Sequence, residues 1–171
     1  MIFNYELGVK KEHMKNSKVN HRQAVRGIIF RDNRILMVYT NKGDYKFPGG
    51  GVNKEETFEA ALMREVCEET GYTVNNIQGK IGAMVERKID DFDGISMFEM
   101  TSHYYLCEVS NTKTAQNLDD YEADLDFQPI WILIDEAIKI NEEILKKDSN
   151  DRNPWVDRDT LVLKELRKIR G

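Results

Sequence analysis

The alternation of apolar and polar residues along the chain predicts a series of strands and three helices. Apolar, β-branched and aromatic residues dominate five stretches that read as strands: His21–Arg31, Ile35–Thr40, Tyr72–Lys88, Ser96–Val109 and Phe127–Ile134. Asn75, Asn76 and Gly79 interrupt the third stretch, so it holds one or two strands. Asp32-Asn33 lies between the first two stretches and suits a tight hairpin turn.

The helices follow from composition and from residues that end or begin a helix. Lys54–Thr70 contains no Gly or Pro, which predicts a helix that ends at Gly71. A second helix is expected from Asp135, as its N-cap, to about Lys147, and a third over Val156–Ile169. Strands flanked by a few helices without strict alternation predict an α/β or α+β sandwich with a mixed sheet. Two loops complete the prediction: a structured Gly-rich loop at Asn41–Gly51 and an acidic loop at Ser110–Asp126.

The length of 171 residues corresponds to one domain with a short extension. We expect a main domain over residues 21–148 and an arm or extra strand over residues 1–20. Residues 149–171 are expected to form a C-terminal helix packed on the same domain. A homodimer through residues 1–20 or through the last helix is left open.

Composition and charge exclude several classes of function. The longest apolar runs, about five residues, are too short to cross a membrane, and no secretory signal is visible. The two cysteines, Cys67 and Cys107, are expected to be reduced thiols, which favours a cytoplasmic location. The net charge of −5 argues against binding of nucleic acid by bulk attraction. A phosphate-bearing partner therefore needs a local source of positive charge.

The helix at 54–70 places its carboxylates on an apolar face. At about 100° per residue, with Phe58 at zero, Leu62, Ala61 and Val66 lie at about 40°, 300° and 80°. On the same wheel Glu65, Glu68 and Glu69 lie at about 340°, 280° and 20°, inside the apolar arc. Inward-facing carboxylates repel one another and lose hydration, so they need protons or a cation. Clustered oxygen ligands suit Mg²⁺ or Mn²⁺.

The spacing of these residues resembles a known family signature. Gly50, five residues, Glu56, seven residues and then the run from Arg64 to Tyr72 resemble the Nudix box at every fixed position. The preceding Tyr45-Lys46-Phe47-Pro48-Gly49 is similar to the entry to that box, and a weaker likeness to MutT-like domains covers roughly residues 21–147.

The resemblance implies a Nudix-type α/β/α sandwich with a mixed β-sheet and the Nudix loop-helix-loop. It implies hydrolysis of a nucleoside diphosphate linked to another moiety, aided by Mg²⁺ or Mn²⁺, with a small-molecule nucleotide as substrate. Carried over by position, Glu65 and Glu69 are the principal metal ligands, with Glu68 and the Gly49 carbonyl as further ligands. Arg64 holds the glutamates in place, and Glu56 supports the loop.

Residues outside the box supply further candidates. The general base or an extra metal ligand is expected in the late acidic loop, with Glu122 as the candidate among its acids, and the alternative is that this loop is merely solvated. Arg22 and Arg26 either contact substrate phosphates or face solvent, and Tyr45 and Phe47 either stack on a base or anchor the loop. Structural roles are expected for four other side chains: His21, His103, Trp131 and Trp155.

Two other functions compete with hydrolysis. A nucleotide-sensing or regulatory module would keep the fold without turnover, but such a module could lose the glutamates, and all of them are present. A pure interaction protein would show no dependence on metal. The substrate stays open among oxidised nucleoside triphosphates, nucleotide sugars including ADP-ribose, dinucleoside polyphosphates and capped RNA ends.

Overall fold

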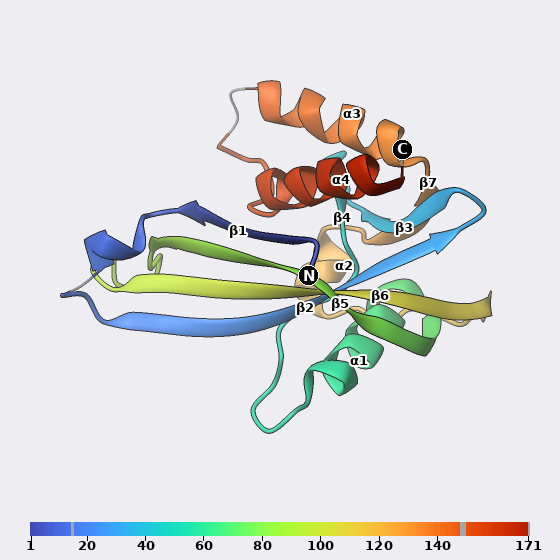
Figure 1. Ribbon diagram of the computed structural model, residues 1–171, viewed down its shortest axis with the longest axis horizontal. Helices are drawn as coiled ribbons and strands as arrows, with labels where there is room; N and C mark the ends of the chain where they lie inside the picture. The colour runs from blue at the N-terminus through green and yellow to red at the C-terminus, as the bar shows by residue number, and fades with distance from the viewer. Residues whose placement is uncertain (15, 148–149, 171) are drawn as a thin grey trace.

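A mixed, strongly elongated sheet forms the centre of the computed structural model, which describes residues 1–14, 16–147 and 150–170 (Figure 1). The strand order in those residues is β1-β5-β6-β2-β3-β4, and β7 pairs with β3. β1 runs parallel to β5 and β2 runs parallel to β6, whereas the other pairs are antiparallel. The strands are β1 (Phe3–Gly8), β2 (Val19–Arg31), β3 (Arg34–Tyr39), β4 (Tyr45–Lys46), β5 (Tyr72–Ile89), β6 (Met97–Lys113) and β7 (Gln128–Ile132).

Helices cover both faces of this sheet. α1 (Phe58–Thr70) packs on one face, and α3 (Ile134–Lys146) and α4 (Val156–Arg170) pack together on the other (Figure 1). A 3-10 turn, η1 (Lys11–Met14), follows β1, and the short helix α2 (Asp120–Asp124) lies between β6 and β7. The arrangement confirms the predicted α/β/α sandwich with a mixed sheet.

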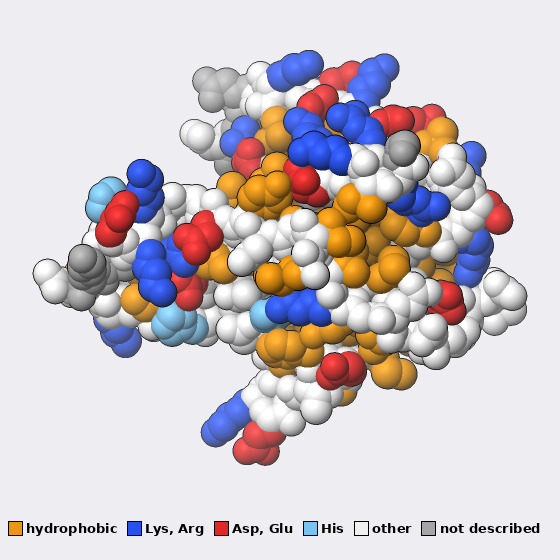
Figure 2. Space-filling view, viewed as in Figure 1, with side chains coloured by type: hydrophobic (Ala, Val, Ile, Leu, Met, Phe, Trp, Pro, Cys, Tyr) orange, Lys and Arg blue, Asp and Glu red, His pale blue; other side chains and the backbone are white. Residues whose placement is uncertain are grey.

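Alternation along the strands builds a separate core on each face. In β3, Leu36 packs in the cluster that contains Leu62 and Val66 of α1, whereas its neighbours Ile35 and Met37 pack in the cluster that contains residues of α3 and α4. A third cluster joins Phe127 and Trp155 next to the loop that follows β3. Away from the cores the helix surface carries mixed charges (Figure 2), as in the pair between Lys164 of α4 and Glu142 of α3 at 2.6 Å.

Several element boundaries differ from the sequence prediction. The helix expected over 54–70 begins at Phe58, because the Thr57 side chain accepts a hydrogen bond from the Ala60 amide and caps it. Gly71 ends it at φ 75°, as predicted. Tyr72–Lys88 lies in one long strand that absorbs its interruptions as bulges.

The second predicted helix and the late acidic loop also differ from their expected bounds. The N-cap of α3 is Leu133, so the prediction of Asp135 as N-cap was wrong; Asp135 lies in the first turn, where its charge suits the helix dipole. The acidic loop begins later than predicted, since β6 extends to Lys113, and it contains α2. The hairpin turn at Asp32-Asn33 is confirmed, with φ of 47° and 61°.

The two ends of the chain pack against the main body. Residues 3–8 form an edge strand beside β5, and α4 packs against α3. The predicted boundary between 148 and 149 lies outside the described residues, so the division into segments stays a prediction. Cys67 and Cys107 are free. Within the described residues, every helix is too short or too polar to cross a bilayer.

Candidate functional site

The glycine-rich loop after β4 is held against β2 by backbone hydrogen bonds. Gly27 donates to the Pro48 carbonyl at 2.8 Å, and Val25 donates to the Gly50 carbonyl at 2.9 Å. Gly49 has φ 139°, and a Cβ there would clash with the Val25 carbonyl, so the loop requires glycine at this position. The loop therefore presents its backbone to α1 in one fixed arrangement.

Arg64 joins this loop to the helix. Its guanidinium binds both carboxylate oxygens of Glu56 at 2.8 Å and Glu65 Oε1 at 2.6 Å. It also donates to the Gly51 carbonyl at 3.2 Å, and Glu56 accepts from the Asn53 amide at 2.9 Å. The Arg64 guanidinium lowers the pKa of Glu56 to about 2, so Glu56 stays ionised. Arg64 and Glu56 thus brace the loop and orient Glu65.

The three box glutamates are not equivalent. Glu65 and Glu69 are buried, as the helical wheel predicts. Glu68 is one third exposed at its side chain and binds Arg64 at 3.2 Å, so the prediction that it also faces inward was wrong. Its helix position points it toward the Arg64 brace. Within the described chain, the acidic group that brings ligand oxygens within 4.8 Å of one another is Glu65, Glu69 and Glu122, without Glu68.

Lys46 already supplies one positive charge to this group. Its ammonium lies 2.5 Å from Glu69 Oε1 and 3.4 Å from the Gly49 carbonyl, and both side chains are nearly inaccessible, at 4% and 2% exposed. The Gly49 amide donates to Glu69 Oε2 at 2.9 Å. Burial raises the pKa of Glu69 and lowers that of Lys46, because both charged forms lose hydration. Lys46 alone therefore compensates the buried carboxylates only in part.

Glu122 reaches the site from α2. Asp119 caps α2, and a reciprocal capping box ties Glu122 Oε2 to the Asp119 amide at 3.0 Å. Gln116 places this segment, since its side-chain amide donates to the carbonyls of Glu69 at 2.6 Å and Phe127 at 2.8 Å. Burial, reinforced by the charge of Glu69, raises the pKa of Glu122 to about 7.

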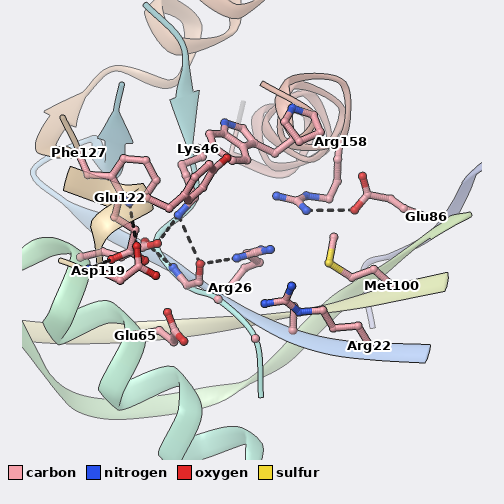
Figure 3. A pocket seen from close by; sticks show the side chains of 18 residues that line it. Arg22, Arg26, Lys46, Glu65, Glu86, Met100, Asp119, Glu122, Phe127 and Arg158 are labelled. Atoms are coloured by element: carbon pink, nitrogen blue, oxygen red, sulfur yellow. Dashed lines mark hydrogen bonds and ion pairs between the residues drawn. The ribbon is translucent and has the colours of Figure 1, made fainter. Parts of the chain in front are cut away.

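These groups line a pocket of about 410 Å³ (Figure 3). Arg22 is exposed at its rim, whereas Arg26 is only 7% exposed and donates to the Gly49 carbonyl, so the solvent-facing alternative was wrong for Arg26.

Tyr45 and Phe47 are buried against Tyr39 and Tyr104 and do not line the pocket. They anchor the loop, and neither ring has a free face for a base. The pocket lining also includes Arg22, Arg26, Lys46, Glu86, Trp155 and Arg158.

The other aromatic and histidine side chains have structural contacts. His103 binds Gln23 at 2.6 Å and stacks on Phe58, and burial lowers its pKa to about 4. His21 lies 3.0 Å from Glu99. Trp131 donates to the Tyr72 hydroxyl, and Trp155 donates to Asp44 at 2.6 Å while also facing the pocket.

The sequence interpretation missed Lys46 and Arg158. No periodicity marks Lys46, because its two-residue strand is too short to show alternation. Arg158 did carry a signal, since it lies four residues before the buried Val162, on the inner face of α4. The wheel test that identified Glu65 would have identified Arg158 as well.

The oxygen groups at this site fit a hard divalent cation. Glu65, Glu69 and Glu122 provide carboxylate oxygens, and the nearby Gly49 carbonyl provides a neutral one. All of these donors are oxygens, the ligand type that Mg²⁺ and Mn²⁺ prefer. Burial raises the pKa values of Glu69 and Glu122, and a bound cation would offset the hydration that their charged forms lose.

Solved structures of other proteins have a similar fold. A solved MutT Nudix hydrolase from Burkholderia pseudomallei is similar with a TM-score of 0.54 at 19% identity, over 86% of this chain and 98% of that one. A Nudix hydrolase from Nitrosomonas europaea is similar with a TM-score of 0.53 at 20% identity, over 87% and 91% of the two chains. These likenesses show the fold.

Sequence comparison extends the likeness to the family. A curated protein of Methanocaldococcus jannaschii named ADP-ribose pyrophosphatase is 41% identical over 69 residues, which span 37% of this chain and 41% of that protein. The chain therefore matches less than half of the length of this relative. The model of the NUDIX domain matches residues 20–158, most of the chain. The protein therefore belongs to the NUDIX domain family.

Proposed function

We propose that this Nudix hydrolase cleaves the pyrophosphate bond of a nucleoside diphosphate linked to another moiety, with Mg²⁺ or Mn²⁺ as cofactor. The observation that carries the proposal is the meeting of Glu65, Glu69 and Glu122 in one pocket whose other walls hold arginines. Carboxylates and arginines in one cavity suit a cation and a phosphate chain together. The cation and the pocket arginines would thereby supply, within a net acidic chain, the local positive charge that a phosphate needs.

Each residue has a distinct task in this proposal. The cation would be held by Glu65, Glu69, Glu122 and the Gly49 carbonyl. Glu68 pairs with Arg64 instead. When bound, the ion offsets phosphate charge and lowers the pKa of an attacking water. Glu122, which lies at the edge of the cation site, would also accept the proton of that water as the general base. Arg64, paired with Glu56, holds Glu65 and the glycine-rich loop in position.

The substrate class is best tested by a screen in Mg²⁺ and Mn²⁺ that measures released phosphate, pyrophosphate and nucleotide. ADP-ribose comes first, because the curated relative is named for its hydrolysis. Oxidised nucleoside triphosphates, other nucleotide sugars, dinucleoside polyphosphates and capped RNA follow. We expect metal-dependent turnover of at least one class. Nucleotide binding without turnover of any of them would favour the sensing module instead.

Divalent metal is expected to stabilise the folded protein. At 100 times its dissociation constant a ligand adds about 2.7 kcal/mol, which for a chain of this size raises Tm by about 5 °C or more. The shift should be larger at pH 8 than at pH 6, because protonation of Glu122 below its pKa of about 7 competes with the cation. Thermal denaturation followed by circular dichroism, with and without Mg²⁺ or Mn²⁺, measures both effects.

The metal-free protein should respond to pH in the opposite sense. The pKa of Glu122 is raised in the fold from 4.5 to about 7, so its contribution to stability is complete below pH 4.5. That contribution is lost as the pH rises through 7. For the metal experiment, a Tm that millimolar Mg²⁺ or Mn²⁺ leaves unchanged at both pH 6 and pH 8 would show that the carboxylates do not form a cation site.

A further inference from the structure

Two buried guanidinium groups face the same pocket with hydrogen-bonding capacity left over. Arg26 and Arg158 are 7% and 2% exposed, and both line the cavity. The buried Nε of Arg26 and the buried Nη2 of Arg158 have no hydrogen-bond partner. Buried polar groups are nearly always paired, and an unpaired donor on a charged group is especially costly. The pocket lining therefore includes two N–H donors that lack a hydrogen-bond acceptor.

The fold holds Arg158 rigidly in this position. Its Nε binds Asp159 Oδ1 at 2.7 Å, and its Nη1 binds Glu86 Oε2 at 3.0 Å. Asp159 is itself fixed, since it accepts from the Phe47 amide at 2.9 Å. Two of the three guanidinium nitrogens are thus used to orient the side chain, and the third, Nη2, is left without a partner on a residue that lines the cavity. In Figure 3 the guanidinium extends from α4 toward Arg26.

The charges around these two groups also favour an anion. Burial, together with the positive charge of Arg158, lowers the pKa of Arg26, and Arg22 adds a third guanidinium at the rim. Figure 3 shows these arginines on one side of the cavity and Glu65, Asp119 and Glu122 on the other. The pocket is therefore divided into an acidic part, where a cation would bind, and a basic part.

We propose that Arg26 and Arg158, with Arg22 at the rim, form an anion subsite that binds a second phosphoryl group of the substrate, next to the one attacked. The inference deepens the proposed function and rests on it for the identity of the ligand as a substrate phosphate. The guanidinium fork matches phosphate oxygens in geometry and charge. α4 thereby supplies a residue that determines specificity for substrates with a chain of two or more phosphates.

Binding of inorganic phosphate to the metal-free protein tests the subsite without any turnover. Isothermal titration calorimetry in a low-chloride buffer should detect phosphate binding to the wild-type protein. Glu86→Gln removes a negative charge beside Arg158 but keeps an oxygen that accepts from its Nη1, and should tighten phosphate binding by about threefold or more. Glu108→Gln makes the same charge change on an exposed residue that does not line the pocket, and should leave the affinity unchanged.

Arg158→Lys keeps the charge but removes the fork, and should weaken phosphate binding by about tenfold. If that variant fails to fold, the Glu86→Gln and Glu108→Gln pair still decides. Equal phosphate affinity in those two variants, or phosphate binding only after Mg²⁺ is added, would overturn the subsite. An inactive protein that binds phosphate as described would reject the hydrolase proposal alone, and an active one with no response to Glu86→Gln would reject the subsite alone.

Discussion

Glu69→Gln is expected to lower the rate of pyrophosphate hydrolysis by about 10³-fold, the scale on which the loss of a group that stabilises transition-state charge acts. Glu69 is the most buried of the clustered carboxylates and contacts both Lys46 and the Gly49 amide. Glutamine has the same shape but lacks the charge that holds a cation. Single-turnover assays with saturating Mg²⁺ measure the effect on the chemical step.

The fold should survive this substitution. The amide oxygen of the introduced glutamine would still accept the Gly49 amide proton, and Lys46 can lose its own proton because burial already lowers its pKa. Glu59→Gln, an exposed position on the same helix, is the matched control and should keep the wild-type rate. A folded Glu69→Gln protein with wild-type turnover would remove Glu69 from the mechanism.

Glu122→Gln is expected to lower the rate by about 10²-fold, the usual contribution of a general base. The pH dependence should change with it. In the wild-type protein with metal the rate rises as Glu122 loses its proton, with a midpoint below the metal-free pKa of about 7, because a bound cation favours the carboxylate. Without that carboxylate, the acid limb due to Glu122 should disappear.

Asp124→Asn provides the control for Glu122, since Asp124 is exposed on the same short helix and does not line the pocket. Its rate and pH profile should match those of the wild-type protein. If Glu122→Gln also retains the wild-type rate and acid limb, the base must be sought among the other pocket carboxylates. A loss of metal-induced stabilisation in Glu122→Gln with an unchanged acid limb would assign the residue to cation binding alone.

The placement of Glu122 illustrates what spacing along the chain cannot decide. Five acids lie between 119 and 126, and nothing in their order distinguishes one from the others. The choice depends on Gln116, whose hydrogen bonds to the carbonyls at the end of α1 and the start of β7 bring α2 over the cluster. Asp119 caps α2 through a capping box with Glu122, and Glu122 is the acid of this loop that lies at the cluster.

Local patterns did determine much of this protein. The helical wheel identified Glu65 and Glu69 as buried, because the 3.6-residue period of a helix relates neighbours in sequence to one face. Gly71 marked the end of α1, since its backbone conformation is costly for other residues. The mixed sheet between helix layers followed from the order of the strands and helices and from the family resemblance.

The residues that share the pocket are distant in sequence and are brought together by packing between elements. Lys46 of β4, Arg26 of β2, Glu122 of α2 and Arg158 of α4 come from four separate elements and meet because the sheet and α4 pack around the glycine-rich loop. Such contacts depend on packing between elements, which no local period encodes. The helical period places Glu65 and Glu69 on the buried face of α1, whereas the packing of distant elements places the positive charges of Lys46, Arg26 and Arg158 in the same pocket.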